Sequence, residues 1–130
     1  MKSKRTHDKI YLSENRYRKP KEMFKFIEKR AFGKKKIKRR EIVSDIGCAA
    51  GEYLFYLKKK HPEKSFIGID VREDLLKKAK KFLPDIDLKK GSVLNKNIAK
   101  ENVFHKTFLI GVHPIFDSFE KCFANLIYWT

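Results

Sequence analysis

The sequence predicts an α/β fold, in which a mostly parallel sheet carries helices on both faces and follows an N-terminal helical arm. Two observations lead to this prediction. Short runs rich in β-branched residues alternate with longer segments whose apolar residues recur at helical spacing. Strands that alternate with helices favour a parallel sheet with right-handed connections. The chain has 130 residues, of which 42% are hydrophobic, and this is enough for one core.

Residues 1–40 form the predicted basic arm. They contain 17 Lys/Arg and 4 Asp/Glu, a net charge of +13, whereas residues 41–130 carry only +3. A short helix is expected at 13–17, and Pro20 suits the first turn of a second helix that Gly33 ends. The apolar positions of that second helix recur at helical spacing. They are Met23, Phe24, Ile27 and Ala31.

Four segments have the composition of strands. Residues 41–46 are a β-branched run that ends at Gly47, and residues 65–70 form a similar run. Residues 86–88 alternate and predict a short third strand, and residues 107–112 predict a fourth. A complete doubly wound sheet has more strands than this, so we expect the sheet to be incomplete.

Three segments after the arm predict helices. Residues 51–60 and 73–83 each have lysines toward their end and are followed closely by a proline, which favours a helix C-terminus. Residues 116–129 predict a last helix, while residues 93–100 are too mixed to assign. The apolar face of the last helix is expected to contain Phe119, Cys122, Phe123, Leu126 and Ile127, with Trp129 also in the core.

Candidate ligand-binding residues follow the predicted strands, because an open parallel sheet binds ligands at the carboxyl ends of its strands. Residues 45–51, Asp-Ile-Gly-Cys-Ala-Ala-Gly, follow the first strand with small residues that let a ligand approach the backbone. Asp70 ends the second strand, where a carboxylate can accept hydrogen bonds from ribose hydroxyls. Residues 91–93 come after the third strand, and residues 111–114 come at the end of the fourth.

The pattern of residues 45–51 argues against a dinucleotide site. A G-x-G-x-x-G motif beginning at Gly47 would need glycine where Ala49 and Glu52 stand. Asp45 would also repel a pyrophosphate. A buried carboxylate favours a ligand with positive charge, and S-adenosyl-L-methionine carries a sulfonium and an ammonium group.

Residues 42–129 resemble the front half of the class I S-adenosylmethionine-dependent methyltransferase family, a Rossmann-like fold. Residues 45–51 are similar to its first motif, with Ala49 where glycine is common, and Gly68-Ile69-Asp70-Val71 resembles the second. Gly91-Ser92-Val93 and Leu109-Ile110-Gly111-Val112 resemble the third and fourth. The family sheet normally has seven strands, and the likeness ends after the fourth strand and its helix.

The resemblance implies a set of cofactor contacts. Asp70 would hold the ribose, Val71 would pack on adenine, and Ser92 would face the adenine amino group. No catalytic residue and no metal site are indicated. The residues implied to bind S-adenosyl-L-methionine are Asp45, Gly47, Cys48, Ala49, Gly51, Asp70, Val71, Ser92, Val93, Ile110 and Gly111.

The function implied is methyl transfer to an acceptor that the sequence does not identify. Such reactions work largely by proximity and orientation, so a dedicated base is not required. An alternative is a non-catalytic remnant or nucleic-acid-binding module that uses the basic arm. A third reading, a nucleotide-dependent oxidoreductase, is opposed by the failed glycine pattern.

The arm suggests an anionic partner such as nucleic acid, anionic lipid or an acidic substrate, unless lysine is simply the default exposed residue. Tyr11, Tyr17 and the basic residues around them either cover the cofactor pocket or bind substrate, or belong to an amphipathic helix that packs on the sheet, and the helix is favoured. Cys48 and Cys122 form no CxxC pair and are expected to be buried thiols. With no apolar run near 20 residues and no secretory signal, a cytoplasmic location is expected. The oligomeric state is not indicated.

Overall fold

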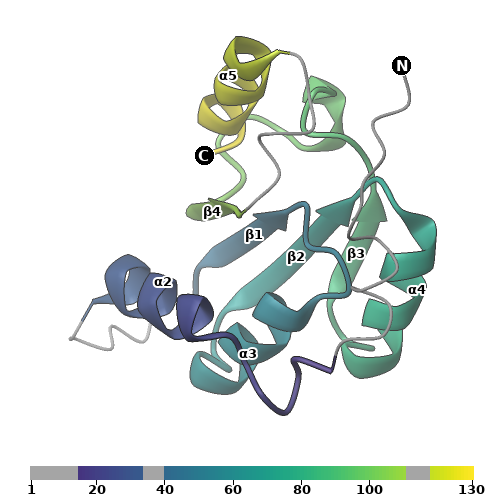
Figure 1. Cartoon of the computed structure of the whole chain (residues 1–130). Coiled ribbons are helices and arrows are strands. Elements are labelled where there is room, and N and C mark those ends of the chain that lie inside the picture. Colours follow the sequence, from purple (N-terminus) through teal and green to yellow (C-terminus); the bar gives the residue numbers. More distant parts are fainter. Residues whose placement is uncertain (1–14, 34–39, 111–117) are drawn as a thin grey trace.

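The computed structural model describes residues 15–33, 40–110 and 118–130. Its sheet has four parallel strands in the order β3-β2-β1-β4 (Figure 1). The strands are β1 (Ile42–Ile46), β2 (Ser65–Asp70), β3 (Asp87–Lys90) and β4 (Lys106–Leu109). The predicted α/β architecture with a parallel sheet is therefore confirmed.

Helices cover both faces of the sheet. On one face lie α2 (Glu22–Phe32), α3 (Glu52–Lys60) and α4 (Glu73–Phe82). On the other lie the short 3-10 helix η1 (Lys96–Ile98) and α5 (Phe119–Trp129) (Figure 1). The two consecutive crossovers from β1 to β2 and from β2 to β3 place α3 and α4 on the same face, as right-handed connections require.

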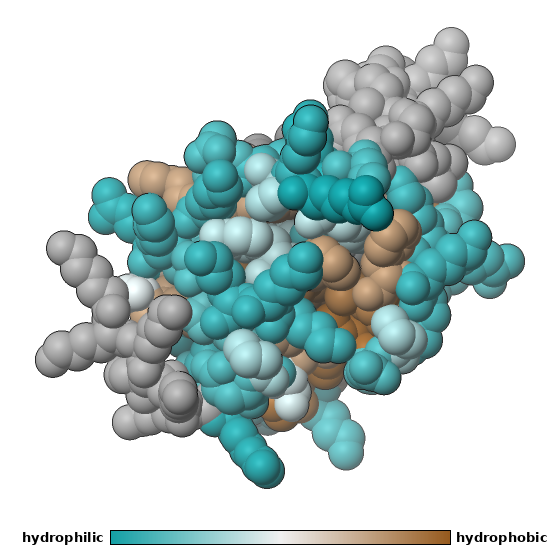
Figure 2. Space-filling model, turned by 90° about the horizontal axis from the view of Figure 1, so that it is seen from below, coloured by the Kyte–Doolittle hydropathy of each residue, from teal (hydrophilic) through white to brown (hydrophobic). Residues whose placement is uncertain are grey.

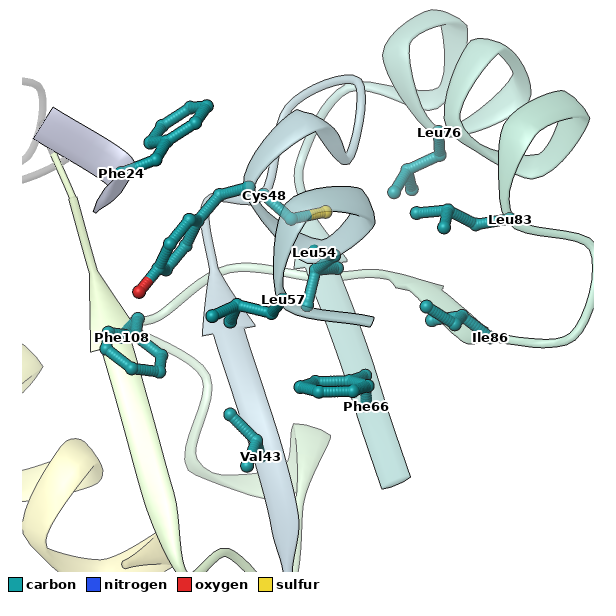
Figure 3. Packing of buried hydrophobic residues seen from close by; sticks show 11 residues of the cluster. Phe24, Val43, Cys48, Leu54, Leu57, Phe66, Leu76, Leu83, Ile86 and Phe108 are labelled. Atoms are coloured by element: carbon teal, nitrogen blue, oxygen red, sulfur yellow. The ribbon is translucent and has the colours of Figure 1, made fainter. Parts of the chain in front are cut away.

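Each face has its own hydrophobic cluster. The cluster under α2, α3 and α4 joins Val43, Phe66 and Phe108 from three strands to side chains of the helices, among them Phe24 of the arm (Figure 3). The cluster under α5 contains Ile46, Ile69, Val93, Phe104, Cys122 and Trp129. Successive strand residues point to opposite faces, so β1, β2 and β4 contribute to both clusters, whereas β3 contributes Leu88 to the first cluster alone.

An ion cluster joins the starts of three strands. It lies at the end of the sheet opposite the carboxyl ends of the strands. The Glu41 carboxylate accepts hydrogen bonds of 2.8 Å from both Lys64 and Lys106. These lysines hold the pKa of Glu41 well below its usual range, at about 2. The cluster fixes the beginnings of β1, β2 and β4 relative to one another.

The structure corrects several predicted bounds. Residues 16–18 form a turn rather than the expected helix, while 13 and 14 lie outside the described residues. The third strand is β3 at Asp87–Lys90, shifted from 86–88, and β4 ends at Leu109 rather than at residue 112. Helix α5 begins after Ser118, whose hydroxyl accepts a hydrogen bond from the Lys121 amide, so a side-chain cap sets the start.

The expected apolar face of the last helix is wrong in part. Cys122 and Trp129 are buried as expected, but Phe119, Phe123 and Ile127 are 56%, 49% and 70% exposed. The sequence LIYW at its end gives α5 apolar residues on two sides, and only the side with Cys122, Asn125 and Trp129 faces the sheet. Periodicity identified the helix but could not decide between the two sides.

Both cysteines are buried and unpaired, as expected. Within the described residues, no helix is long and apolar enough to cross a membrane.

Candidate functional site

The loop after β1 crosses the carboxyl edge of the sheet beside the place where the strand order reverses, between β1 and β4. Three of its residues adopt positive φ: Gly47 (77°), Ala49 (50°) and Gly51 (74°). Gly51 directly precedes α3, and its amide closes the turn by donating a hydrogen bond to the Cys48 carbonyl. Small residues are required here because larger side chains are strained at these dihedrals.

Backbone hydrogen bonds bring the ends of β1, β2 and β3 together. The amides of Gly47 and Cys48 both donate to the Ile69 carbonyl, at 2.7 and 3.1 Å. The Gly91 amide donates to the Asp70 carbonyl at 2.9 Å. Three of the four predicted motifs are therefore adjacent in space.

The Asp70 carboxylate is fixed by two backbone amides. Oδ2 accepts a hydrogen bond of 2.9 Å from Ala49, and Oδ1 accepts one of 2.8 Å from Arg72. Each carboxylate oxygen retains a further lone pair, so the group can still accept hydrogen bonds from a ligand. The Ala49 contact also ties the first motif to the second.

Asp45 is fully enclosed beneath this loop. It is 3% exposed, and its register partners are Gly68 on β2 and Phe108 on β4. Burial, together with the negative charge of Asp70, raises the pKa of Asp45 to about 8. Two acidic groups so close to one another favour the approach of a cation.

The packing around Asp45 depends on Gly68. A Cβ atom at this position would lie 2.7 to 2.9 Å from side-chain atoms of Leu88, Leu54 and Cys48. Burial and the charges of Asp45 and Asp70 raise the pKa of the Cys48 thiol, so Cys48 is an unreactive packing residue.

The remaining predicted contacts lie in different environments. Val71 is 39% exposed just beyond β2. The Ser92 hydroxyl accepts a hydrogen bond from the Leu94 amide at 3.1 Å, and the Val93 side chain is in the core beneath α5. Ile110 is half-buried after β4, and Gly111 lies outside the described residues.

Tyr17 reaches this loop from the arm. Its ring is buried, and its hydroxyl donates a 2.5 Å hydrogen bond to the carbonyl of Ala50. The ring stacks on Phe82 at 3.8 Å and meets the edge of Phe55 at 5.3 Å. The expected amphipathic helix packing on the sheet is wrong for Tyr17, which lies in a turn and contacts α3, α4 and the 47–51 loop, while Tyr11 lies outside the described residues. The hydrogen bond had no signal in the sequence, because 33 residues separate its partners.

Tyr53 is a second tyrosine that sequence reasoning did not place near the site. Burial, followed by the charges of Asp45 and Glu28, raises the pKa of its phenol. Among the described residues its hydroxyl has no hydrogen-bond partner. No local pattern distinguishes it from an ordinary core aromatic.

Comparison with known proteins agrees with this arrangement. A family model described as "Putative methyltransferase" matches residues 39–117. A tRNA (guanine-N(7)-)-methyltransferase of Prochlorococcus marinus strain MED4 is 40% identical over 68 residues, which is 48% of this chain and 29% of that protein. A second, from strain MIT 9215, is 53% identical over 36 residues, 28% of this chain and 17% of that protein. The chain thus matches less than a third of the length of these relatives.

Two solved structures share the fold. A SAM-dependent methyltransferase from Aquifex aeolicus superposes with a TM-score of 0.71 at 22% identity, covering 96% of this chain and 66% of that one. One from Archaeoglobus fulgidus gives 0.66 at 20% identity, covering 93% and 53%.

Proposed function

The chain belongs to the class I S-adenosylmethionine-dependent methyltransferase family, and on that premise we propose that it binds S-adenosyl-L-methionine at the carboxyl edge of β1 and β2. The observation that carries the proposal is the buried Asp45 beside Asp70. A pair of carboxyl groups with low exposure suits a ligand that is cationic and lacks phosphate.

The residues present fit such a ligand. Asp70 keeps lone pairs for the ribose hydroxyls, and its orientation is fixed by the Ala49 and Arg72 amides. Val71 offers an exposed apolar surface for a base. The loop at 47–51 has no side chain larger than that of cysteine, so its backbone can lie close to the methionine portion.

The proposed contacts at Ser92, Val93, Ile110 and Gly111 are weaker. Ser92 is engaged in its own turn, and Val93 can contribute only through its backbone because its side chain is in the core. These four positions complete the proposed cofactor set of Asp45, Gly47, Cys48, Ala49, Gly51, Asp70 and Val71.

When bound, S-adenosyl-L-methionine supplies an electrophilic methyl group, whose bond to sulfur breaks with the electron pair remaining on sulfur. The contribution of this chain is to hold and orient: Asp70 and the 47–51 loop fix the cofactor, and Asp45 provides a compensating charge. Positioning of this kind can account for much of a rate enhancement.

For the acceptor we propose guanine N7 in tRNA. The support is that the two relatives described above are named as tRNA (guanine-N(7)-)-methyltransferases. Guanine N7 has a lone pair and no proton, so its methylation requires no proton abstraction. Such an acceptor suits a reaction that works largely by proximity and orientation. Membership of the family disfavours the alternative of a non-catalytic module.

Calorimetry with S-adenosylhomocysteine tests cofactor binding. Asp70→Asn should weaken binding about tenfold or more, because a charge-assisted hydrogen bond contributes about 1.5–3 kcal/mol. Asp87→Asn is the matched control, since Asp87 is an exposed acid on β3. Undetectable binding by the folded wild-type chain would refute the proposal.

The acceptor is tested separately. The chain is incubated with radiolabelled S-adenosyl-L-methionine and unmodified tRNA transcripts, and the nucleosides are separated after digestion. Label in 7-methylguanosine supports the proposed acceptor. Label in another nucleoside, with none in 7-methylguanosine, overturns the proposed acceptor and leaves the cofactor proposal intact.

A further inference from the structure

The two faces of the sheet differ in charge. Helices α2, α3 and α4 contain ten basic and five acidic residues, whereas α5 and η1 together contain two basic and one acidic. The basic residues of the first face are Lys25, Lys29, Arg30, Lys58, Lys59, Lys60, Lys77, Lys78, Lys80 and Lys81. The ratio of basic to acidic residues is the same in both groups of helices, but basic residues make up a larger share of the first group, and its net positive charge is larger.

Several acids on the basic face are buried or paired. Glu52 is 7% exposed, and the Glu28 carboxylate lies 2.8 Å from His61 with 13% of its side chain exposed. Asp74 is bound by Arg72. The lysines Lys59, Lys60, Lys77, Lys80 and Lys81, in contrast, are exposed. Lys25 and Lys58 of this face are likewise paired, with Glu22 and Asp85, so the net positive charge of the face is the one that its composition gives.

The segment 15–21 adds four more basic residues to this face. Tyr17 fixes the segment between α3 and α4 through its contacts with Phe55 and Phe82. The Lys78 ammonium lies 5.9 Å from the centre of the Tyr17 ring. The four basic residues are Arg16, Arg18, Lys19 and Lys21.

Aromatic rings lie among these charges. Phe82 is 43% exposed and Phe26 is 60% exposed, and the Arg30 guanidinium lies 5.4 Å from the Phe26 ring centre. Figure 2, which views the molecule from below Figure 1, shows hydrophilic side chains around a hydrophobic area. Basic side chains interspersed with exposed rings are typical of surfaces that bind phosphate backbones and stack on bases.

Helix capping explains only part of the pattern. Lysines at 58–60 and 80–81 lie in last turns, where the helix dipole favours them. Lys77 lies in the middle of α4, and Arg18 and Lys19 lie outside any helix. These positions need another explanation.

We propose that the basic face, defined as residues 15–21 with α2, α3 and α4, binds the phosphate backbone of an RNA. This inference rests on the proposed RNA acceptor and names the surface that would hold it. The Tyr17 hydrogen bond to Ala50 joins this face to the candidate cofactor loop, so RNA bound here lies beside the site.

The test measures binding of an unmodified tRNA transcript by fluorescence anisotropy across a series of salt concentrations. Lys77→Glu/Lys81→Glu changes the basic face, and Lys100→Glu/Lys121→Glu makes the same charge change at exposed positions elsewhere. The first pair should weaken binding about tenfold and lower the salt slope by about 1.4–1.8, because each of two phosphate contacts contributes about 0.7–0.9. The second pair should change affinity less than about twofold.

A second variant, Lys77→Gln/Lys81→Gln, distinguishes loss of RNA contacts from loss of folding, since it removes charge without placing an acidic residue near a helix C-terminus. It should weaken binding about threefold with an unchanged melting temperature. Equal losses from the basic-face pair and the control pair would overturn the inference, as they would reflect net charge alone.

Anionic phospholipid vesicles provide the competing partner. Vesicle binding that the basic-face pair abolishes, together with RNA binding that it leaves unchanged, would assign the face to a membrane and overturn the inference. Calorimetry with S-adenosylhomocysteine separates the two proposals. If the wild type binds the cofactor and the basic-face pair leaves RNA binding unchanged, only the inference about the basic face is overturned. Face-dependent RNA binding without cofactor binding supports the surface and counts against methyl transfer.

Discussion

The Tyr17 hydroxyl donates a 2.5 Å hydrogen bond to the carbonyl of Ala50, and this contact joins the basic arm to the loop that follows β1. The ring is held by Phe82 and Phe55, so the hydroxyl has little freedom to leave the carbonyl. The conformation of the candidate cofactor loop therefore depends on a residue that lies well outside the motifs of the family.

Tyr17→Phe should weaken binding of S-adenosylhomocysteine and lower stability. The ring contacts remain, but the Ala50 carbonyl loses its partner, which costs about 1–2 kcal/mol of unfolding free energy. We expect affinity to fall about three- to tenfold, since 1.4 kcal/mol corresponds to a factor of ten. Calorimetry and urea denaturation measure the two effects.

Tyr56→Phe is the control, because Tyr56 lies on α3 and is only half-buried. It should change stability by no more than about 0.5 kcal/mol and leave affinity unchanged. If Tyr17→Phe and Tyr56→Phe bound S-adenosylhomocysteine with the same affinity, the Tyr17–Ala50 hydrogen bond would have no role in shaping the 47–51 loop.

Asp45→Asn should raise stability at neutral pH and weaken cofactor binding. The pKa of Asp45 is raised to about 8 in the folded protein, so between its ordinary value of 3.8 and 8 the folded state holds a proton that the unfolded chain releases. Stability therefore falls as pH rises through this window. Asparagine removes this effect, and at pH 7.5 the melting temperature should rise by roughly 3–5 °C for each kcal/mol gained.

The same substitution gives a pH signature for the ligand. A cationic ligand favours the ionised Asp45, so the affinity of the wild type for S-adenosyl-L-methionine should increase between pH 6 and 8. The affinity of Asp45→Asn should be lower and should not change with pH. Calorimetry at several pH values measures this. An unchanged affinity in the variant would show that Asp45 does not contribute to binding.

Glu41→Gln should destabilise the fold at neutral pH. The folded pKa of about 2 lies below the ordinary 4.5, so the carboxylate contributes stability that is present above pH 4.5 and is lost as pH falls toward 2. We expect a loss of about 1–2 kcal/mol at pH 7, because two charge-assisted hydrogen bonds are weakened. The difference from wild type should disappear near pH 2.

Glu101→Gln, at an exposed position, is the control for Glu41 and should leave the pH profile of stability unchanged. A constant difference between wild type and Glu41→Gln from pH 7 to 2 would contradict the assignment to the Lys64 and Lys106 contacts.

Tyr53→Phe should be neutral or stabilising by up to about 1 kcal/mol, since it removes a buried hydroxyl that has no partner among the described residues. Thermal unfolding measures the change. A loss above 1 kcal/mol would mean that the hydroxyl has a hydrogen-bond partner in solution.

The sequence by itself determined the order of strands and helices, the parallel sheet and the placement of three motifs at one edge. These follow from local patterns: β-branched runs, helical periodicity, and glycines where the chain turns with positive φ. Asp45 and Asp70 could be singled out because each falls where a strand ends.

Only the tertiary structure decided which side of α5 is buried, where Tyr17 makes its hydrogen bond, and how strongly Asp45 is perturbed. Phe119 and Phe123 are apolar and yet exposed, because the sheet can contact only one side of the helix. The Tyr17–Ala50 contact and the Glu41 cluster join residues that are far apart in the chain. The division of charge between the two faces likewise depends on the direction of each crossover, which brings α3 and α4 to one side of the sheet.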